Sequence, residues 1–456
     1  MFLAKKHKAR RDRTVQAQSI RGGEVEIEYT SKALSGWGGL ALLFEFGERV
    51  GFFRCLKGVL PNKKTSPNQV RDTDVVKTLY ATVLGGGNRF AHVERVRGDE
   101  VIRQVMGAER VGSADTVRRY FERLSASEGE AIYAELQRVM STMLWRHAKE
   151  DVLDLDSTIL ERYGKQQGVG KGYHTSRAGQ RSHHPLLGML AKSKYIVHTW
   201  LRAGGASTLR GAVEFVDELL VRLPVGFKIT AIRADSGFYN ENYLSAFEAR
   251  QIDYIVPVRM HPPMKRLAAR TANEAWKRLD DEHEIADITH QEPTWSRPRR
   301  ILLIRRGIEQ KGALFDSVSY EYSALATSLT MSAEDCSAFY DQRGECENTI
   351  KEFKNDFGAR GFCLTSFNGT EAVFRLISIL FNLITEFKRQ VLRDTSVTLA
   401  TVRVKIFVLG AMLGRRARKT VLRLGLVQRW KERFDALLER ACSVQDPTAA
   451  QFAPSS

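Results

Sequence analysis

Hydrophobic and polar positions repeat with two different periods along the chain, and the period changes near residue 146. Before that point apolar residues recur every three to four positions, which predicts helices over 36–56 and 72–84 and a pair between 98 and 125. Three glycines at 85–87 follow the second helix, and Ser113 stands where a residue would cap the last one. We expect residues 1–145 to form a helical region, preceded by a basic arm and a short strand over 23–29.

From residue 146 onward, short alternating runs predict strands over 150–160, 183–193, 195–204, 227–235 and 253–260. Helical patterns over 208–223 and 240–251 separate the later strands. Three strands followed by alternating helices and strands predict a mixed sheet with helices on its faces.

The second half of the chain adds an interruption, two long helices and a basic tail. Residues of about 260–318 read as a β-rich insertion, and a strand over 320–329 follows it. Ser332 and Asp335 form a capping box, which predicts one helix from there to residue 358. A mostly buried helix is expected over 370–393, a basic β-hairpin over 401–424 and a final helix from residue 427. The predicted domains are therefore 1–145, 146–395 and 396–456.

Bulk composition narrows the class of protein. The chain has 456 residues and a net charge of +17, which favours a polyanionic partner such as nucleic acid, although a merely basic soluble protein fits as well. Basic residues concentrate at 5–13 and 414–419. No secretory signal or long apolar run is evident, and five scattered cysteines form no paired motif, so we expect an intracellular, reducing compartment without a membrane span.

The helix predicted over 114–124 carries three arginines: Arg118, Arg119 and Arg123. A helix–turn–helix DNA reader has this appearance. A helical hairpin with a basic outer face has it too, and the sequence does not separate the two.

A polar line follows the helix predicted after Ser332. At 100° per residue, Tyr340, Arg343, Glu347 and Lys354 fall within a stripe of about 60°, beside an apolar stripe that faces the core. Glu345 and Glu352 fall on the opposite, solvent side. An ordinary helical ion pair explains Arg343 and Glu347, but it does not explain the other two residues.

Two aspartates at strand ends, Asp156 and Asp235, are placed to meet Glu347 at one edge of the sheet. Three carboxylates with no histidine or thiol suit a hard cation such as Mg²⁺, which prefers oxygen ligands. Two such ions about 3.5–4 Å apart activate a water or a 3′-hydroxyl in phosphoryl transfer.

These residues resemble those of the DDE transposases of bacterial insertion sequences. The matching signature is Tyr340, Arg343, Glu347 and Lys354, with Asp156 before Ser157-Thr158, Asp235 before Ser236-Gly237, and Asn382 in the following helix. The resemblance implies an α/β, RNase H-like mixed sheet flanked by helices, with a β-rich insertion and an N-terminal helical DNA-binding domain.

The same resemblance implies a function. Asp156, Asp235 and Glu347 would hold two Mg²⁺ ions, with Mn²⁺ as a substitute, while Tyr340, Arg343 and Lys354 would grip DNA phosphates. The enzyme would cleave at the terminal inverted repeats of its own element and join the 3′-hydroxyl ends to target DNA. It would act as a homodimer on paired ends, in the bacterial cytoplasm at the nucleoid.

Several alternatives remain at this point. Asp154 shares a strand face with Asp156 and competes with it as the first acid. Arg233, two residues before Asp235, either contacts DNA or balances the acids. The basic, glycine-rich segment 162–185 is either a DNA-gripping loop or a plain loop, and Trp295 is either a packing residue or a platform for an extruded base. An inactive DNA-binding protein of the same fold, or a nuclease without strand transfer, also fits.

Overall fold

The computed structural model describes residues 19–20, 25–26, 29–61, 66, 68–171, 179–206, 211–309 and 318–447. The basic arm at 5–13 lies outside this part, as does most of the strand predicted over 23–29. Of that strand, Val25–Glu26 (β2) is present and pairs with Ser19–Ile20 (β1).

The N-terminal region is helical, as predicted. Its helices are α1 (Leu40–Arg49), α2 (Phe52–Val59), α3 (Asp72–Leu84), α4 (Val93–Arg97), α5 (Glu100–Val105), α6 (Ala114–Glu122) and α7 (Ala126–Trp145), with a 3-10 turn η1 (Phe90–His92). Ser113 caps α6 by accepting the Thr116 amide at 3.1 Å, as expected. The single helix predicted over 36–56 is wrong, because the chain turns at Gly51, whose φ of 74° is left-handed and ends the helix.

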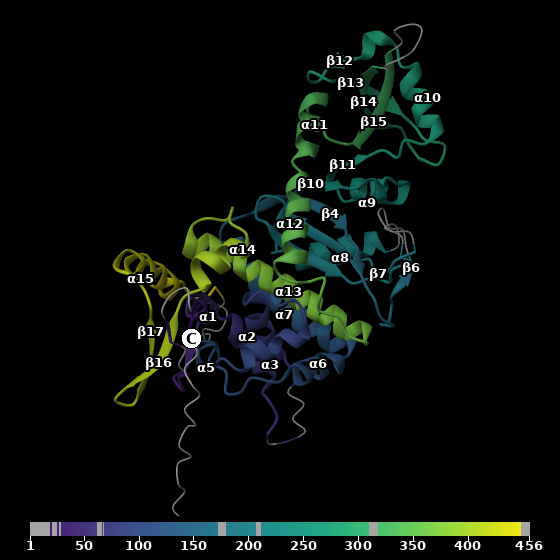
Figure 1. Cartoon of the computed structure of the whole chain (residues 1–456). Coiled ribbons are helices and arrows are strands. Elements are labelled where there is room, and N and C mark those ends of the chain that lie inside the picture. Colours follow the sequence, from purple (N-terminus) through teal and green to yellow (C-terminus); the bar gives the residue numbers. More distant parts are fainter. Residues whose placement is uncertain are drawn as a thin grey trace, which may run out of the picture.

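A nine-stranded mixed sheet extends from the middle of the molecule to one of its ends (Figure 1). Its core strands are β9 (Tyr195–Trp200), β8 (Leu186–Leu190), β4 (Glu150–Ser157), β10 (Lys228–Ala234) and β11 (Asp253–Pro257), in that spatial order. β4 runs antiparallel to β8 and parallel to β10, and β10 runs parallel to β11. Helices α8 (Ala212–Arg222) and α9 (Glu241–Ala249) lie between consecutive strands of the chain. The predicted α/β class, an RNase H-like mixed sheet flanked by helices, is confirmed.

The insertion extends this same sheet. After β11 come α10 (Pro262–Arg270) and a 3-10 turn η3 (Asn273–Ala275), then β12 (Lys277–Arg278), β13 (His283–His290), β14 (Arg299–Glu309) and β15 (Val318–Thr327). β15 pairs antiparallel with β11, so the chain returns beside the strand it left. A separate small sheet of β5 (Leu160–Glu161), β7 (Arg181–His183) and β6 (Gly170–Lys171) lies beyond the end of β4.

The helix predicted from Ser332 to residue 358 is in fact two helices, α11 (Ala333–Asp341) and α12 (Gly344–Asn355). Ser332 caps the first, as expected, by accepting the Asp335 amide at 3.0 Å. Between the two helices the hydrogen bonds span three residues, as in a tight turn, and not the four of an α-helix. The Arg343 amide donates to the Tyr340 carbonyl and the Cys346 amide donates to the Arg343 carbonyl, each at 2.9 Å. Arg343 therefore stands at a break in the helix and not within a continuous stripe.

Helix α13 (Phe367–Phe387), continued by a π-helical turn η4 (Lys388–Leu392), packs against α7 and β9 (Figure 1). Within the described residues, one helix is long and apolar enough to cross a membrane, and it spans Phe367–Leu392. However, 83% of its most apolar stretch is buried inside the protein, as in a core helix. Asn382 fixes this helix to strand β9. Its side-chain amide accepts a hydrogen bond from the backbone N–H of Ile196 and donates one to the backbone carbonyl of Ile196, each at 2.9 Å.

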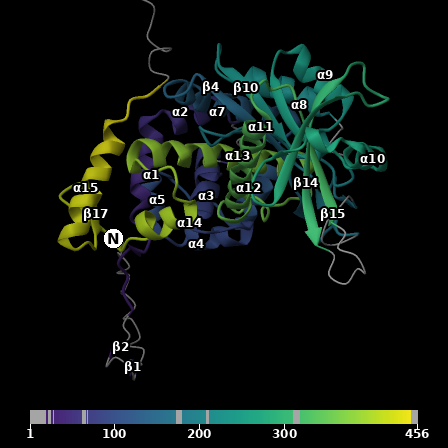
Figure 2. The same ribbon diagram turned by 90° about the horizontal axis from the view of Figure 1, so that it is seen from above.

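The C-terminal part packs back on the N-terminal helices. It comprises α14 (Leu399–Val402), a π-helical turn η5 (Arg403–Phe407), β16 (Ala411–Arg416), β17 (Lys419–Leu424) and α15 (Gln428–Ser443), which contacts α1. β16 pairs with β3 (Leu34–Ser35). The hairpin predicted over 401–424 is confirmed only from residue 411 onward, since 401–407 is helical. α15 and the β-rich insertion lie at opposite ends of the molecule, as Figure 2 also shows.

Candidate active site

Two of the predicted acids lie at the same edge of the sheet. Asp156 is near the end of β4, and Asp235 directly follows β10, the parallel neighbour in which Ala234 is in register with Leu155. Each carboxylate is oriented by the backbone, since Asp156 Oδ1 accepts the Ser157 amide and Asp235 Oδ1 accepts the Gly237 amide, both at 2.8 Å. The strand register therefore brings the two side chains together, as predicted.

Arg343 connects Asp156 to Glu347, the third of the predicted acids. Its Nη2 lies 3.2 Å from Asp156 Oδ1, and its Nη1 donates to Glu347 Oε1 at 3.2 Å. The Asp156 side chain is 15% exposed and that of Arg343 is 8% exposed, whereas that of Glu347 is 68% exposed. The Arg343 guanidinium therefore pairs with one mostly buried carboxylate, that of Asp156, and one exposed carboxylate, that of Glu347.

The charges of both other acids reach Asp156. Burial raises the pKa of Asp156 to about 6, and the negative charges of Asp235 and Glu347 push in the same direction. Arg343 and the Ser157 amide oppose this rise. Burial lowers the pKa of Arg343, but the charge of Asp156, together with smaller effects of Tyr340, Cys346 and Asp235, outweighs burial, so the pKa is raised and the guanidinium stays charged. The site thus has an excess of negative charge held by a single buried cation.

The other two residues of the polar line lie around the same strand ends. The Tyr340 hydroxyl donates to the Ala234 carbonyl at 3.4 Å, and burial raises its pKa to about 12. Lys354 Nζ lies 2.9 Å from Thr158 Oγ1, two residues after Asp156. Burial and the nearby Arg360 lower the pKa of this amine. The predicted set converges in space even though the helix that carries it is broken.

The alternative first acid, Asp154, has a different partner. The Arg233 guanidinium makes two bonds to its carboxylate, at 2.7 and 2.9 Å, and a third to the Phe339 carbonyl at 2.8 Å. Both side chains are only 2% exposed. Arg233 was a candidate DNA contact. The structure corrects that prediction, because an interior guanidinium saturated by a buried carboxylate does not reach DNA; it balances the acids.

The arginines of α6 lie elsewhere. Arg118 and Arg119 are exposed and both pair with Asp115, at 2.9 and 2.8 Å, while Arg123 is exposed at the end of the helix. In Figure 1, α6 lies below α13 and well away from α12. The structure does not bring these arginines to the acids, so DNA contact by them stays a separate prediction.

The solvent-facing assignment of Glu352 is wrong. Its side chain is 13% exposed, and its Oε1 accepts the Leu399 amide at 2.7 Å, beside Lys388 at 3.8 Å. Asp356 Oδ2 similarly accepts the Ala400 amide at 3.3 Å. Glu352 of α12 and Asp356, the residue directly after α12, thus bind amides at the start of α14, so the helix that carries Glu347 is tied to the C-terminal part.

His184 makes two hydrogen bonds beside the acids that the sequence did not reveal. Its Nδ1 lies 3.2 Å from the Ala206 carbonyl, and its Nε2 lies 3.2 Å from Ser157 Oγ. Because a carbonyl only accepts, Nδ1 carries the proton and Nε2 accepts from Ser157. His184 therefore orients the residue after Asp156. The only hint in the sequence was that Ser157, the partner of His184, directly follows Asp156.

Within the described residues, no three His, Cys, Asp or Glu side chains are close enough together to hold a metal ion. The donor set at the strand ends is nevertheless all oxygen, and Arg343 supplies there the positive charge that hard cations supply in carboxylate sites. In its chemistry the set fits divalent magnesium.

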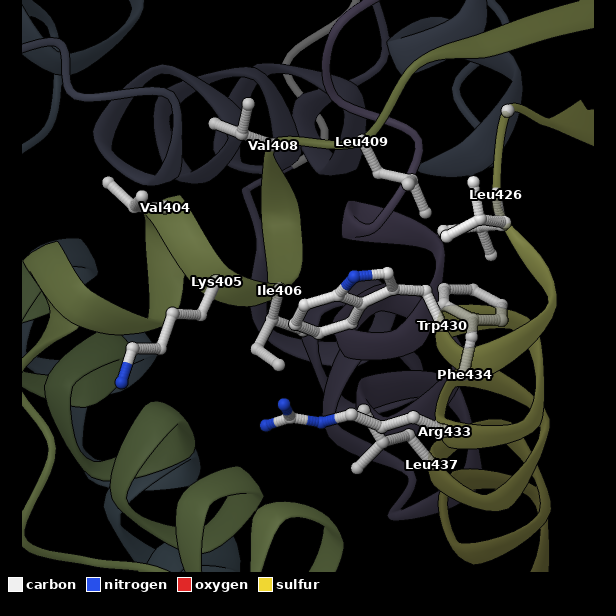
Figure 3. A pocket seen from close by; sticks show the side chains of 12 residues that line it. Val404, Lys405, Ile406, Val408, Leu409, Leu426, Trp430, Arg433, Phe434 and Leu437 are labelled. Atoms are coloured by element: carbon white, nitrogen blue, oxygen red, sulfur yellow. The ribbon is translucent and has the colours of Figure 1, made fainter.

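Two other features lack this chemistry. Trp295 is 6% exposed, and the Arg299 guanidinium lies 4.8 Å from the centre of its ring, so it is a packing residue. A groove of about 430 Å³ lies between η5 and α15 (Figure 3). Trp430 and Ile406 face each other across it, and its lining contains no carboxylate.

Comparison with known protein families gives a match over most of the chain. The family described as "Transposase DDE domain group 1" matches residues 17–445, which is nearly the whole chain. The protein therefore belongs to this family of DDE transposases. No curated protein matches the chain.

Among solved structures, a piggyBac transposase synaptic complex with hairpin DNA aligns with 83% of this chain and 82% of its own chain, at 10% identity and a TM-score of 0.45. At that score the likeness is too weak to identify shared features.

Proposed function

We propose that the chain is the transposase of a bacterial insertion sequence. It cleaves DNA at the terminal inverted repeats of its own element and joins the resulting 3′-hydroxyl ends to target DNA. The observation that carries the proposal is that Arg343 pairs with both Asp156 and Glu347 at the edge of a mixed sheet, where Asp235 and Glu347 lie within electrostatic reach of Asp156. Membership of the DDE transposase family supports the same reaction.

Asp156, Asp235 and Glu347 are the residues that would hold two divalent ions, Mg²⁺ or Mn²⁺. When bound, such ions activate the attacking water or 3′-hydroxyl and stabilise the leaving oxygen. Arg343 pairs with both Asp156 and Glu347. If metal ions took up the charge of these carboxylates, its guanidinium would be released to pair with a DNA phosphate, for which its forked geometry is suited.

Lys354 and Tyr340 position the substrate. Lys354 is held beside Asp156 by Thr158, and its amine has no carboxylate partner among the described residues, so it is available for a phosphate near the cleaved bond. Tyr340 stays protonated at neutral pH, because burial raises the pKa of its hydroxyl to about 12, and it offers a hydrogen-bond donor. A homodimer on paired element ends, acting at the bacterial nucleoid in the cytoplasm, completes the proposal.

The test is cleavage and joining of labelled DNA that carries the element's own terminal repeats, with a supercoiled plasmid as target. The variant is Glu347→Gln, and its matched control is Glu345→Gln, since Glu345 is on the same helix with a side chain 69% exposed and no bond to the site. We expect Glu347→Gln to bind but not cut in Mg²⁺, and Glu345→Gln to cut and join like the parent chain.

Each other outcome identifies a different protein. Equal cutting by both variants would remove Glu347 from the reaction. Cutting without joined products would identify a nuclease, and DNA binding without cutting by the parent chain would identify an inactive DNA-binding relative. Replacing Mg²⁺ by Ca²⁺ should preserve binding and abolish cutting.

A further inference from the structure

The C-terminal part contains a long stretch without acidic residues. Between Asp394 and Glu432 the sequence has no aspartate or glutamate, yet it holds nine cations: Arg403, Lys405, Arg415, Arg416, Arg418, Lys419, Arg423, Arg429 and Lys431. A protein surface that serves only solubility mixes both signs of charge. This stretch therefore presents a surface suited to a polyanion.

Five of these cations lie on the ribbon formed by β16 and β17. In its register Arg416 pairs with Lys419 and Met412 pairs with Arg423, and because directly paired residues share a face, three cations project from one side. Leu413 pairs with Leu422 on the other side. Arg415, paired with Thr420, projects from that other side too, and Arg418 lies in the turn, next to Ala417 with its left-handed φ of 52°.

The glycine on the basic face has a role in this arrangement. Gly414 is paired with Val421, and a Cβ atom at Gly414 would lie 3.1–3.3 Å from the Arg423 guanidinium. A larger residue would push Arg423 away. The absence of a side chain lets this cation lie flat along the ribbon, in line with those nearer the tip.

The ribbon cations lack the partners that other surface arginines have. Arg49 pairs with Glu45 at 2.7 Å and Arg97 with Glu94 at 3.2 Å, and Arg278 pairs with Asp281. Within the described residues, no carboxylate forms an ion pair with any of the five ribbon cations: Arg415, Arg416, Arg418, Lys419 and Arg423. All five are exposed. Their charge is unneutralised and directed to solvent.

We propose that the β16–β17 ribbon is a DNA-binding arm that holds the phosphate backbone of a DNA duplex outside the active site. A two-stranded ribbon is narrow enough to enter the major groove, and cations along one face then contact phosphates on its walls. The partner is double-stranded DNA because the surface offers repeated point charges and no aromatic side chain for stacking unpaired bases. This inference rests on the proposed function and extends it to a second contact region.

The root of the ribbon is fixed relative to the catalytic acids. Glu352 of α12 and the adjoining Asp356 bind amides at the start of α14, just before the ribbon, and the Arg403 guanidinium donates to the Asp356 carbonyl at 2.9 Å. Arg403 also donates to the Leu84 carbonyl at 2.8 Å, which ties α3 into the same joint. A duplex held on the ribbon is therefore held at a set position from Glu347. Figure 1 draws the ribbon at the outer side of the molecule, beside α15 and away from the insertion.

The test measures the binding of a fluorescent 40-base-pair duplex by anisotropy across a series of salt concentrations, with Mg²⁺ absent. The test variant replaces the three cations of the basic face: Arg416→Gln, Lys419→Gln and Arg423→Gln. The control variant removes the same charge from exposed, ion-paired sites: Arg49→Gln, Arg97→Gln and Arg278→Gln. Circular dichroism and melting curves establish that both variants are folded.

We expect the ribbon variant to bind the duplex at least about tenfold more weakly near physiological salt, because each lost phosphate contact removes about 0.9 from the slope of log affinity against log salt. The control variant should stay within about twofold of the parent chain. Equal weakening in the two variants would overturn the proposal, since net charge alone would then explain it. Unchanged DNA binding with loss of self-association in the ribbon variant would overturn it in favour of an interface between copies.

Failure of the two proposals can be told apart. The binding measurement needs no cleavage, so it stands if the parent chain proves inactive on its terminal repeats. Conversely, cleavage that depends on Glu347 but a ribbon variant that binds normally would retain the proposed function and discard the arm.

Discussion

Replacing Asp156 by asparagine should make the protein more stable at neutral pH while abolishing its chemistry. In the folded protein the pKa of Asp156 is raised from 3.8 to about 6, mainly by burial. A raised carboxyl pKa means that the folded state holds the proton more tightly than the unfolded chain. Stability is therefore greatest below pH 3.8 and falls as the pH rises through 6.

The magnitude follows from the difference between the two pKa values. One pKa unit corresponds to about 1.36 kcal/mol, so ionising Asp156 in the folded state lowers the free energy of unfolding by up to about 3 kcal/mol above pH 6. The Asp156→Asn variant does not carry this cost. It should exceed the parent chain by that amount at pH 8 and by almost nothing near pH 4.

The assay is urea unfolding in EDTA at several pH values between 4 and 8, comparing the parent chain with Asp156→Asn. Glu347→Gln is the control, because a side chain 68% exposed should change stability by no more than about 0.5 kcal/mol at any pH. A variant less stable than the parent at pH 8 would refute the reasoning. It would mean that the ion pair between Asp156 and Arg343 outweighs the cost of burying the carboxylate.

Three further outcomes are expected. Arg233→Gln should lower the free energy of unfolding by about 3–5 kcal/mol in urea, because it leaves the carboxylate of Asp154 buried without a partner; a loss below about 1 kcal/mol would contradict an interior role. Lys354→Gln should slow DNA cleavage about tenfold or more, as expected for one charge-assisted phosphate bond, while Thr158→Val, which removes only the hydroxyl that holds the lysine, should slow it less; the reverse order would contradict the assignment. Burial lowers the pKa of His198 from 6.5 to about 4, so the stability that its neutral form provides is complete above pH 6.5 and is lost as the pH falls toward 4; His198→Gln should flatten this part of the urea midpoint profile, and an unchanged profile would contradict it.

The strand-borne part of the site could be predicted because it depends on local pattern. Asp156 and Asp235 end alternating runs, and parallel strands bring such ends to one edge of a sheet. Glu347 was predicted from its spacing to Arg343 and Lys354. That spacing survives the helix break, because the tight turn at Arg343 advances the chain almost as a helix does.

The remaining features depend on contacts between distant parts of the chain. Whether Arg233 faces DNA or Asp154 is decided by the register of β10 on β4, in which the two residues are direct neighbours. Residues 401–407 alternate like a strand, yet they are helical because Glu352 and Asp356 cap the preceding turn from another helix. No local pattern specifies such partners, and here tertiary contacts override the local preference.

The return of the insertion to its starting point has a consequence for how this chain tolerates change. Ile255 on β11 is in register with Thr327 on β15, so the two ends of the excursion lie on adjacent strands. Material between them can therefore change in length without separating β11 from β15, the paired strands that lie between Asp235 and Glu347 in the chain. The outer strands β12 to β14 are thus the part of the chain where new segments can be accepted while β11 and β15 stay paired.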